Sequence, residues 1–373
     1  MSADFIAPRY ADLALANLLP SVVARLEGNA PIIDIPVARR YVVLLVDGLG
    51  WHQLDGYSDH AEVMSHALPG ALRLTCSVPS TTATSLTSLG CGCGPGEHGV
   101  VGYTFREPTV DRVVNALSWD GGPEDIAAFA QTPTQFELLA RRGEATSAVM
   151  LKRFGASALT RLAFGGAQHR PIELESDQHH VAELINEALT TERLVYAYER
   201  MLDHDGHGFG VGSWQWLERL ASVDDLVATL AETLPADTCL LVTGDHGMVN
   251  IPLESRIVAE ETPALGGYDV LGGEPRFRHI YTTDPARLAA SWRRELGDRA
   301  LVLRREEAVE AGWFGPRMTE TSLARIGDVV AAMTGDFAVM SLGSPGEFGL
   351  VGMHGSLTAT EMEVPLLMLG GSR

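Results

Sequence analysis

The sequence has no hydrophobic run long enough for a membrane-spanning helix, because none of its apolar stretches approaches the ~20 residues that a span requires. Its N-terminal segment, MSADFIAPRY, lacks the basic region and the continuous apolar region of a secretory signal peptide. These two absences predict a cytoplasmic protein without a membrane partner.

Cysteine is scarce, with only Cys76, Cys91, Cys93 and Cys239 in the chain. Their number and spacing do not form the disulfide framework of a small secreted protein. Cys91 and Cys93 lack the two-residue spacing and the matching second pair of a structural zinc site. A zinc site at these two cysteines is therefore the less favoured interpretation.

Positive charge is also in short supply, since 28 Lys and Arg residues stand against 48 Asp and Glu residues, for a net charge of -20. Such a surface repels nucleic acids and anionic membranes, both of which are bound largely through positive charge. We therefore expect no nucleic acid polymer as a partner. An enzyme that binds phosphate still needs positive charge at its site, and bound metal ions can supply it.

Four runs rich in aliphatic and β-branched residues predict strands that are buried on both faces. They span residues 41–46, 194–198, 239–243 and 364–369. Helical spacing of apolar residues predicts helices over 10–27, interrupted near Pro20, and over 178–190 and 213–234. This alternation favours an α/β fold with a mostly parallel sheet covered by helices on both faces. Active sites of such sheets lie at the carboxyl ends of the strands.

Residues 252–335 have a different character. They contain the Gly- and Pro-rich stretch TPALGGYDVLGGEP, followed by the segment RHIYT at 278–282, a predicted helix at about 285–296 and a predicted short strand near 300–304. We interpret residues 1–373 as one catalytic domain, in which 252–335 form an inserted subdomain or a flap.

Acidic and imidazole side chains follow three of the predicted strands, and a further histidine lies near the C-terminus. These candidates are Asp47, Asp203 and His207 in a Gly- and His-rich loop, Asp245 with His246, and His354. Taken singly, each has a simpler interpretation as a turn or a surface loop residue, because Asp and Gly favour turns. Together they provide the carboxylate and imidazole ligands that zinc accepts.

Thr82 follows Pro79 in a run of Ser and Thr residues, and residues 82–89 predict a helix that ends at Gly90. The run could serve only as a helix cap. Alternatively, it places the Thr82 hydroxyl at a helix N-terminus, where free N–H groups favour an anion. Metal coordination can activate a hydroxyl nucleophile without a histidine base.

The order and spacing of these residues resemble the type I phosphodiesterase / nucleotide pyrophosphatase family of the alkaline phosphatase superfamily. The resemblance extends from about residue 41 to residue 369 and is weakest over 252–335. The matching motifs are Asp47, Pro79 with Thr82, Asp203 with His207, Asp245-His246-Gly247, His354-Gly355, and Pro95-Gly96-Glu97-His98-Gly99.

The resemblance implies an alkaline phosphatase-like α/β/α sandwich that binds two divalent metal ions, expected to be zinc. One ion would be held by Asp203, His207 and His354. The other would be held by Asp47, Asp245 and His246, with Thr82 as a further ligand. Thr82 would be the nucleophile and would form a phosphothreonine intermediate.

Two positions depart from the family pattern. Ser85 stands where the family often has an asparagine that contacts a phosphate oxygen, and Ala83 stands where it has an aromatic residue of the nucleotide slot. Nucleotide specificity is therefore not supported. The sulfatase motif Cys-x-Pro-x-Arg is absent.

We expect a phosphodiesterase or nucleotide pyrophosphatase that acts on a small phosphate ester. No Lys or Arg lies near Thr82 in the sequence, which favours a diester over a doubly charged monoester. The alternatives are a phosphomonoester or phosphonate hydrolase on the same scaffold and, as a different class, an inactive metal-binding module. The sequence does not indicate an oligomeric state.

Overall fold

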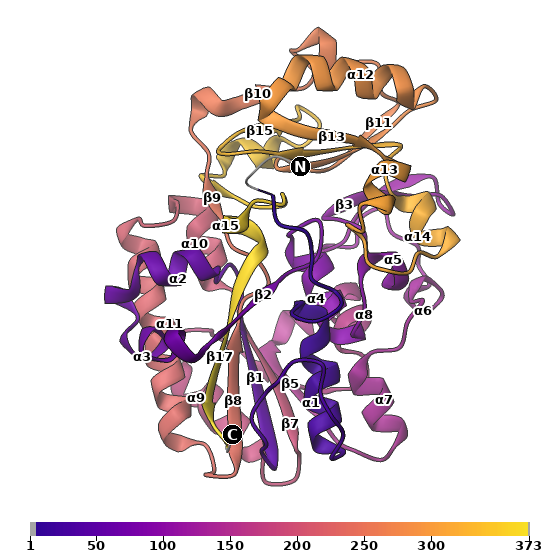
Figure 1. Ribbon diagram of the computed structural model, residues 1–373. Helices are drawn as coiled ribbons and strands as arrows, with labels where there is room; N and C mark the ends of the chain where they lie inside the picture. Colours follow the sequence, from indigo (N-terminus) through magenta and orange to yellow (C-terminus); the bar gives the residue numbers. More distant parts are fainter. Residues whose placement is uncertain (1–4, 372–373) are drawn as a thin grey trace.

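A seven-stranded sheet forms the centre of the computed structural model, which describes residues 5–371 (Figure 1). In order across the sheet, its strands are β2 (Leu72–Thr75), β17 (Glu363–Gly370), β8 (Thr238–Thr243), β1 (Arg40–Val46), β7 (Leu194–Glu199), β5 (Ser147–Leu151) and β6 (Gln168–Ile172). β1 pairs in parallel with both β7 and β8, whereas β17 is antiparallel to β8. The predicted α/β fold with a mostly parallel sheet is confirmed.

Alternate residues of β1 enter two separate hydrophobic cores, as the two-residue period of a strand requires. Val43 and Leu45 belong to one core, and Val42 and Leu44 belong to the other. The first core is covered by α1 (Leu18–Leu26), α4 (Thr82–Cys91), α7 (Gln135–Arg141) and α8 (Ala158–Phe164). The second is covered by α2 (Trp51–Gly56), α3 (Glu62–Ala67), α9 (Gln178–Ala188) and α11 (Trp214–Thr233). A run buried on both faces therefore marks a central strand here.

A smaller antiparallel sheet lies at the top of the molecule in Figure 1. It consists of β11 (Val270–Glu274), β12 (Phe277–Tyr281), β14 (Val329–Met333) and β13 (Ala300–Arg304). Helix α12 (Pro285–Leu296) packs on it and contributes Trp292 to a third core. Nearby, β10 (Arg256–Val258) pairs with β15 (Ala338–Met340). Strand β15 lies outside the predicted range, which ends at residue 335. The interpretation of 252–335 as an inserted subdomain or flap stays a prediction.

Two predicted helices have different ends in the structure. Residues 10–27 contain a short 3-10 turn (Leu15–Asn17) before α1, and Pro20 lies in the first turn of α1, where a missing N–H costs no hydrogen bond. Helix α4 continues past Gly90 to Cys91, and Gly92 at φ 74° ends it. Gly90 is needed for packing, because a Cβ there would overlap the backbone of Ala163 in α8.

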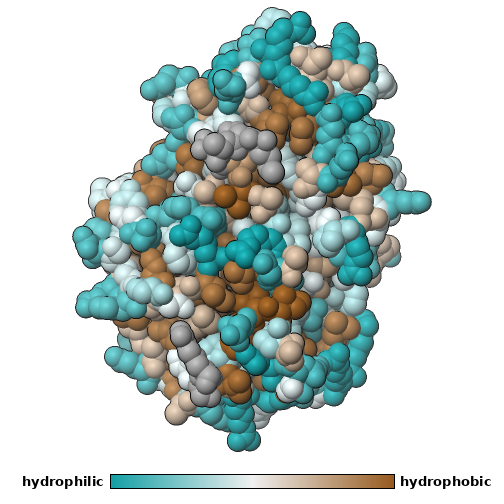
Figure 2. Space-filling model, in the orientation of Figure 1, coloured by the Kyte–Doolittle hydropathy of each residue, from teal (hydrophilic) through white to brown (hydrophobic). Residues whose placement is uncertain are grey.

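Hydrophilic residues surround smaller groups of hydrophobic residues on the face shown in Figure 2, consistent with a chain of which 20% is charged. Among residues 5–371, no helix combines the length and the hydrophobicity needed to cross a membrane.

Candidate active site

Two adjacent parallel strands place the first ligand candidates at one edge of the large sheet. Asp47 follows β1 directly, and Asp245 and His246 follow β8 after a single glycine. The Asp245 Oδ1 atom accepts hydrogen bonds from the backbone N–H groups of Gly48 (3.0 Å) and His246 (3.1 Å). These bonds fix the carboxylate, while its Oδ2 atom is buried without a hydrogen-bond partner.

Asp203 and His207 lie in a helix, so the prediction of a loop at this position is wrong. Helix α10 (Met201–Phe209) begins where the Glu199 carboxylate accepts the backbone N–H of Met201 at 2.8 Å. Asp203 and His207 are one helical turn apart and face the same side, with Asp203 Oδ2 at 3.4 Å from His207 Nε2. Gly206 in this helix has a packing role, since a Cβ there would collide with Met248.

The three histidines of the site share one orientation. In each ring, Nδ1 lies within hydrogen-bonding distance of a backbone carbonyl oxygen, and this fixes the tautomer with the proton on Nδ1. The acceptors are Gly352 for His207 (2.8 Å), Gly247 for His246 (3.0 Å) and Ser80 for His354 (2.9 Å). The Nε2 lone pairs therefore face the site, and those of His207 and His354 are only 3.3 Å apart. Two lone pairs at this distance require a proton or a cation between them.

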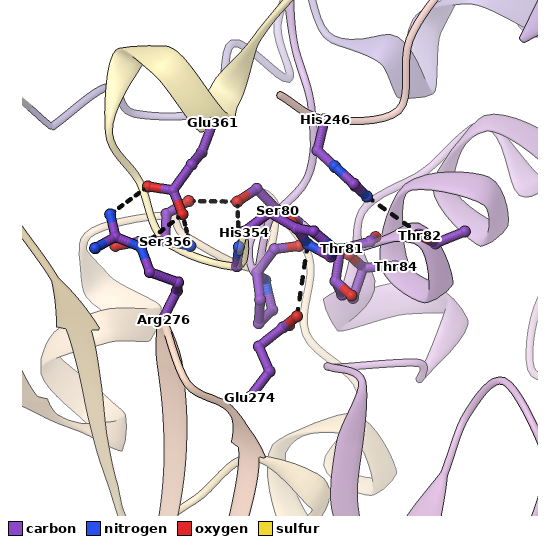
Figure 3. Close-up of polar contacts among 12 residues, drawn as sticks. Ser80, Thr81, Thr82, Thr84, His246, Glu274, Arg276, His354, Ser356 and Glu361 are labelled. Atoms are coloured by element: carbon purple, nitrogen blue, oxygen red, sulfur yellow. Dashed lines mark hydrogen bonds and ion pairs between the residues drawn. The ribbon is translucent and has the colours of Figure 1, made fainter. Parts of the chain in front are cut away.

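Thr82 is the first residue of α4 and follows the N-cap residue Thr81. Its Oγ1 atom lies 3.2 Å from His246 Nε2 (Figure 3). It lies 3.5 Å from Asp47 Oδ1. The other carboxylate oxygen of Asp47 accepts a short hydrogen bond from the Tyr198 hydroxyl, which turns Oδ1 towards the threonine. The threonine hydroxyl is thus held beside the strand-end carboxylate and imidazole.

The structure brings all seven predicted site residues together. Within the described part of the chain, two groups have ligand atoms close enough to hold a metal ion: Asp47, Asp245 and His246, and Asp203, His246 and His354. The first group matches a predicted set. In the second, His246 takes the place predicted for His207, although His207 Nε2 is itself near both Asp203 and His354. The rings of His246 and His354 stack at 3.7 Å, so His246 lies between the two groups.

Burial and like charges shift the pKa values of several site residues in the direction that disfavours their charged forms. Burial, followed by the carboxylates of Asp245 and Asp203, raises the pKa of Asp47 well above its usual value. Burial also raises the pKa of Asp245, with His246 opposing the shift. Burial and the neighbouring imidazoles lower the pKa of His354 well below 6.5. Asp203 Oδ1, like Asp245 Oδ2, is buried without a hydrogen-bond partner and lies near an imidazole nitrogen. Carboxylate oxygen and imidazole nitrogen atoms are the donor set that a divalent cation takes.

Sequence reasoning missed two groups at the site. Tyr198 stood within a predicted strand that is buried along almost its whole length, so no alternation indicated that its hydroxyl contacts Asp47. Glu274 comes from the small sheet, and its Oε2 atom lies 3.6 Å from His354 Nδ1. Burial raises the pKa of Glu274 well above 4.5, and a contact with the Thr81 hydroxyl partly opposes the shift.

The two departures from the family pattern are buried residues of α4. Ala83 is fully buried in the first hydrophobic core. Ser85 is also fully buried, and its hydroxyl has no hydrogen-bond partner among the described residues. Neither residue lines a cavity beside Thr82. The buried position of Ser85 therefore does not support a role in contacting a phosphate oxygen, the role of the family's asparagine.

Two cavities meet at Thr82, Asp203 and His207. The larger, of about 540 Å³, is bounded by the small sheet and residues 344–350. The smaller, of about 240 Å³, is mostly apolar and is bounded by α8. Arg200 in the smaller cavity is the one Lys or Arg among the described residues that line either, and it pairs with Glu175 at 2.9 Å.

The sheet order, the strand-end Asp and His cluster and the threonine at a helix N-terminus together define an alkaline phosphatase-like α/β hydrolase. The chain belongs to the type I phosphodiesterase / nucleotide pyrophosphatase family, whose model matches residues 41–357. This family membership indicates a hydrolase of phosphate esters.

Solved structures show the same fold. Mouse ectonucleotide pyrophosphatase / phosphodiesterase 5 has a TM-score of 0.70 at 18% identity, covering 89% of this chain and 88% of that one. An inactive variant of the mouse protein, with alanine in place of a threonine, has been solved in complex with AMP. Phosphonoacetate hydrolase from Sinorhizobium meliloti, in complex with phosphonoacetate, has a TM-score of 0.66 at 19% identity, covering 90% of this chain and 91% of that one. A comparison with curated proteins found no match.

Proposed function

We propose that this chain is a two-metal phosphodiesterase or nucleotide pyrophosphatase in which Thr82 attacks phosphorus and forms a phosphothreonine intermediate. The observation that supports it most directly is the position of the Thr82 hydroxyl, 3.2 Å from His246 Nε2 and 3.5 Å from Asp47 Oδ1 at the start of a helix. Free N–H groups at this helix end favour the anionic phosphate of the substrate. The inactive threonine variant of the mouse relative is consistent with a nucleophilic role for Thr82.

The proposed metal sites use the donor atoms described above. Asp203, His207 and His354 would hold one ion, and Asp47, Asp245, His246 and the Thr82 oxygen would hold the other. Zinc is the proposed metal because it accepts both imidazole nitrogen and carboxylate oxygen. When bound, the ions supply positive charge that lowers the pKa of the threonine hydroxyl and offsets the charge on the phosphoryl oxygens.

The protein's own groups prepare the reaction. The Tyr198 hydroxyl holds one oxygen of Asp47 so that the other faces Thr82. Attack by Thr82 Oγ1 forms one P–O bond and breaks the bond to the leaving oxygen, which takes up the proton that the threonine gives up. Water then attacks phosphorus, and cleavage of the Thr82–phosphorus bond restores the hydroxyl.

The two cavities favour a substrate with an organic group on each side of the phosphate. They share Thr82 but have otherwise mostly different walls, and they contain no Lys or Arg free of an ion pair among the described residues. A monoester dianion would benefit from such a cation, and so would the carboxylate of phosphonoacetate. The fold shared with phosphonoacetate hydrolase nevertheless keeps a phosphonate hydrolase as the second candidate.

A comparison of hydrolysis rates tests the substrate class. We expect a higher kcat/KM for bis-p-nitrophenyl phosphate than for p-nitrophenyl phosphate or phosphonoacetate. A strong preference for the monoester or the phosphonate would contradict the proposal.

Variants of Thr82 test the nucleophile. Thr82→Ala should lower kcat by at least about 10³-fold, because it removes the attacking oxygen. Thr87→Ala in the same helix is the matched control, since the Thr87 hydroxyl donates only to the carbonyl of Ala83. Unchanged hydrolysis in Thr82→Ala would show that another group attacks phosphorus. Absence of all hydrolysis in the metal-loaded native protein would favour an inactive metal-binding module.

A further inference from the structure

Two cysteines flank the glycine that ends helix α4. Cys91 is the last residue of the helix, Gly92 follows it with φ 74° and ψ 30°, and Cys93 comes next. Thr82 begins the same helix, which contacts α1, α7 and α8 (Figure 1). The two thiols therefore lie at the opposite end of α4 from the candidate active site.

The backbone between the two cysteines is held in a tight turn. A positive φ favours glycine, and a Cβ on Gly92 would lie 2.6 Å from Pro20 Cγ and 2.8 Å from Gln135 Nε2. The Gly92 N–H donates to the carbonyl of Ser88 at 2.9 Å. Cα atoms on either side of a residue in such a helical conformation are about 5.5 Å apart, a separation that a disulfide spans.

The side chains of the pair contact each other. A hydrogen bond with the Cys93 thiol, followed by burial, raises the pKa of Cys91 well above its usual value. Cys91 is 5% exposed, and its sulfur lies 3.6 Å from the carbonyl oxygens of both Thr132 and Leu162. Cys93 is only partly buried. One thiol of the pair is thus enclosed, and the other can be reached from solvent.

The other two cysteines have different surroundings. Cys76 is 1% exposed, and its sulfur lies 3.7 Å from both the carbonyl oxygen of Glu361 and the sulfur of Met362. Cys239 is fully buried in β8. Neither thiol is accessible from solvent, so both serve as reference thiols for the reactivity of the pair.

An accessible thiol beside a buried one is the arrangement of an attacking and a resolving cysteine. The thiolate is the nucleophile in thiol–disulfide exchange, and access decides which sulfur reacts first. Cys93 is therefore the attacking residue. Once Cys93 is bound to another sulfur, the hydrogen bond that keeps the Cys91 thiol protonated is lost, and this favours attack by Cys91.

We propose that Cys91 and Cys93 are a redox-active dithiol, a modification site that closes to an intrachain disulfide by exchange with a low-molecular-weight disulfide. The Cys93 sulfur attacks the small disulfide, and its other half leaves as a thiol with the proton from Cys93. The Cys91 sulfur then attacks the Cys93 sulfur and releases the second small thiol, which takes the proton from Cys91. Two protein thiols are oxidised, and one small disulfide is reduced to two thiols.

Closure of the disulfide changes the contacts at the end of α4. In the reduced protein the Cys91 thiol faces carbonyl oxygens of Leu162 in α8 and of Thr132, which precedes α7. A disulfide sulfur has no hydrogen to donate, so these contacts are lost on oxidation. The modification therefore alters the packing of the helix that begins at Thr82, although the inference does not depend on the proposed hydrolase function.

Incubation of the reduced native protein with glutathione disulfide at mildly alkaline pH tests the proposal. Free thiols are then blocked with iodoacetamide in denaturant. The tryptic peptide 74–106, which lies between Arg73 and Arg106, contains Cys76, Cys91 and Cys93. We expect this peptide to carry an alkylated Cys76 and a disulfide between the other two cysteines, located by fragmentation in the mass spectrometer. Dithiothreitol should reverse the modification.

Variants test the order of attack. Cys91→Ser should accumulate a mixed disulfide between Cys93 and glutathione, because no second thiol can release it. Cys93→Ser should keep Cys91 reduced, because the buried thiol must then meet the oxidant first. Cys239→Ser is the matched control and should form the same disulfide as the native protein.

The native protein alone decides the outcome if a variant fails to fold. Two free thiols after the incubation would overturn the proposal, and so would a stable mixed disulfide at Cys93. A disulfide that joins Cys76 to either cysteine would overturn it as well. Because these measurements are chemical, a failure to hydrolyse phosphodiesters would contradict the proposed function without affecting this inference.

Discussion

Replacing Glu361 by Gln should destabilise the protein strongly, because Arg276 would then be a buried cation without a counter-charge. Both side chains of this pair are 0% exposed. The Glu361 carboxylate accepts two bonds from Arg276 and one from the Ser356 N–H at 3.0 Å (Figure 3). It accepts a fourth from the Thr358 hydroxyl at 2.6 Å. A neutral glutamine has only one oxygen for these four donors. Breaking a buried pair of this kind costs about 3–5 kcal/mol of unfolding free energy.

Urea denaturation of the metal-free protein measures this cost without the contribution of bound ions. The matched control is Glu173→Gln, which breaks the exposed pair with Lys152 and should leave the denaturation midpoint unchanged. Replacing both partners by apolar residues, as in Arg276→Met with Glu361→Leu, should recover much of the loss. If Glu361→Gln were as stable as the control, the ion pair could not be the contact that holds the turn between β11 and β12 in place.

The remaining predictions concern packing, pH and metal. Gly90→Ala should lower the unfolding free energy by about 1–3 kcal/mol because its Cβ would overlap Ala163, whereas Gly56→Ala, with open space around it, should be tolerated in the same denaturation assay. Burial, with a smaller contribution from Arg325, lowers the pKa of His98 to about 3, so the unfolded chain binds the additional proton. Metal-free stability should therefore be lost as the pH falls from about 6.5 towards 3, by up to about 1.4 kcal/mol per pH unit from this residue, and His98→Gln should reduce the measured slope. Chelation should abolish hydrolysis, and zinc should restore it better than magnesium; restoration by magnesium alone would contradict a histidine-rich site.

Strands β1, β7, β8 and β17 could be predicted because they consist of continuous apolar runs, whereas β5 was not predicted although it is fully buried between β7 and β6. Strand β6 escaped prediction because it lies at the sheet edge, is partly exposed and contains Pro171, so that it shows no such run. Helix α10 was taken for a loop because its glycines resemble turn residues. The Glu199 carboxylate that begins the helix and the Met248 side chain that requires Gly206 become visible only in three dimensions.

Some residues of the site could likewise be predicted from the sequence, and others could not. Asp47 and Asp245 could be predicted because adjacent parallel strands end at one edge of a sheet. Glu274 could not be predicted, since its position depends on a hairpin from a separate sheet and on the Arg276–Glu361 pair. Local patterns identify residues at the ends of regular elements, whereas residues delivered by long-range contacts require the structure.

Metal stoichiometry measured together with activity tests the central claim most directly. The metal-free protein is titrated with zinc, and bound metal and hydrolysis of bis-p-nitrophenyl phosphate are followed in the same samples. We predict no activity without metal and a rise that ends at two ions per chain, with fewer ions bound by a variant that lacks His354. Full hydrolysis by the metal-free chain, or a hydrolysis rate that does not depend on the amount of bound zinc, would contradict the two-metal site beside Thr82.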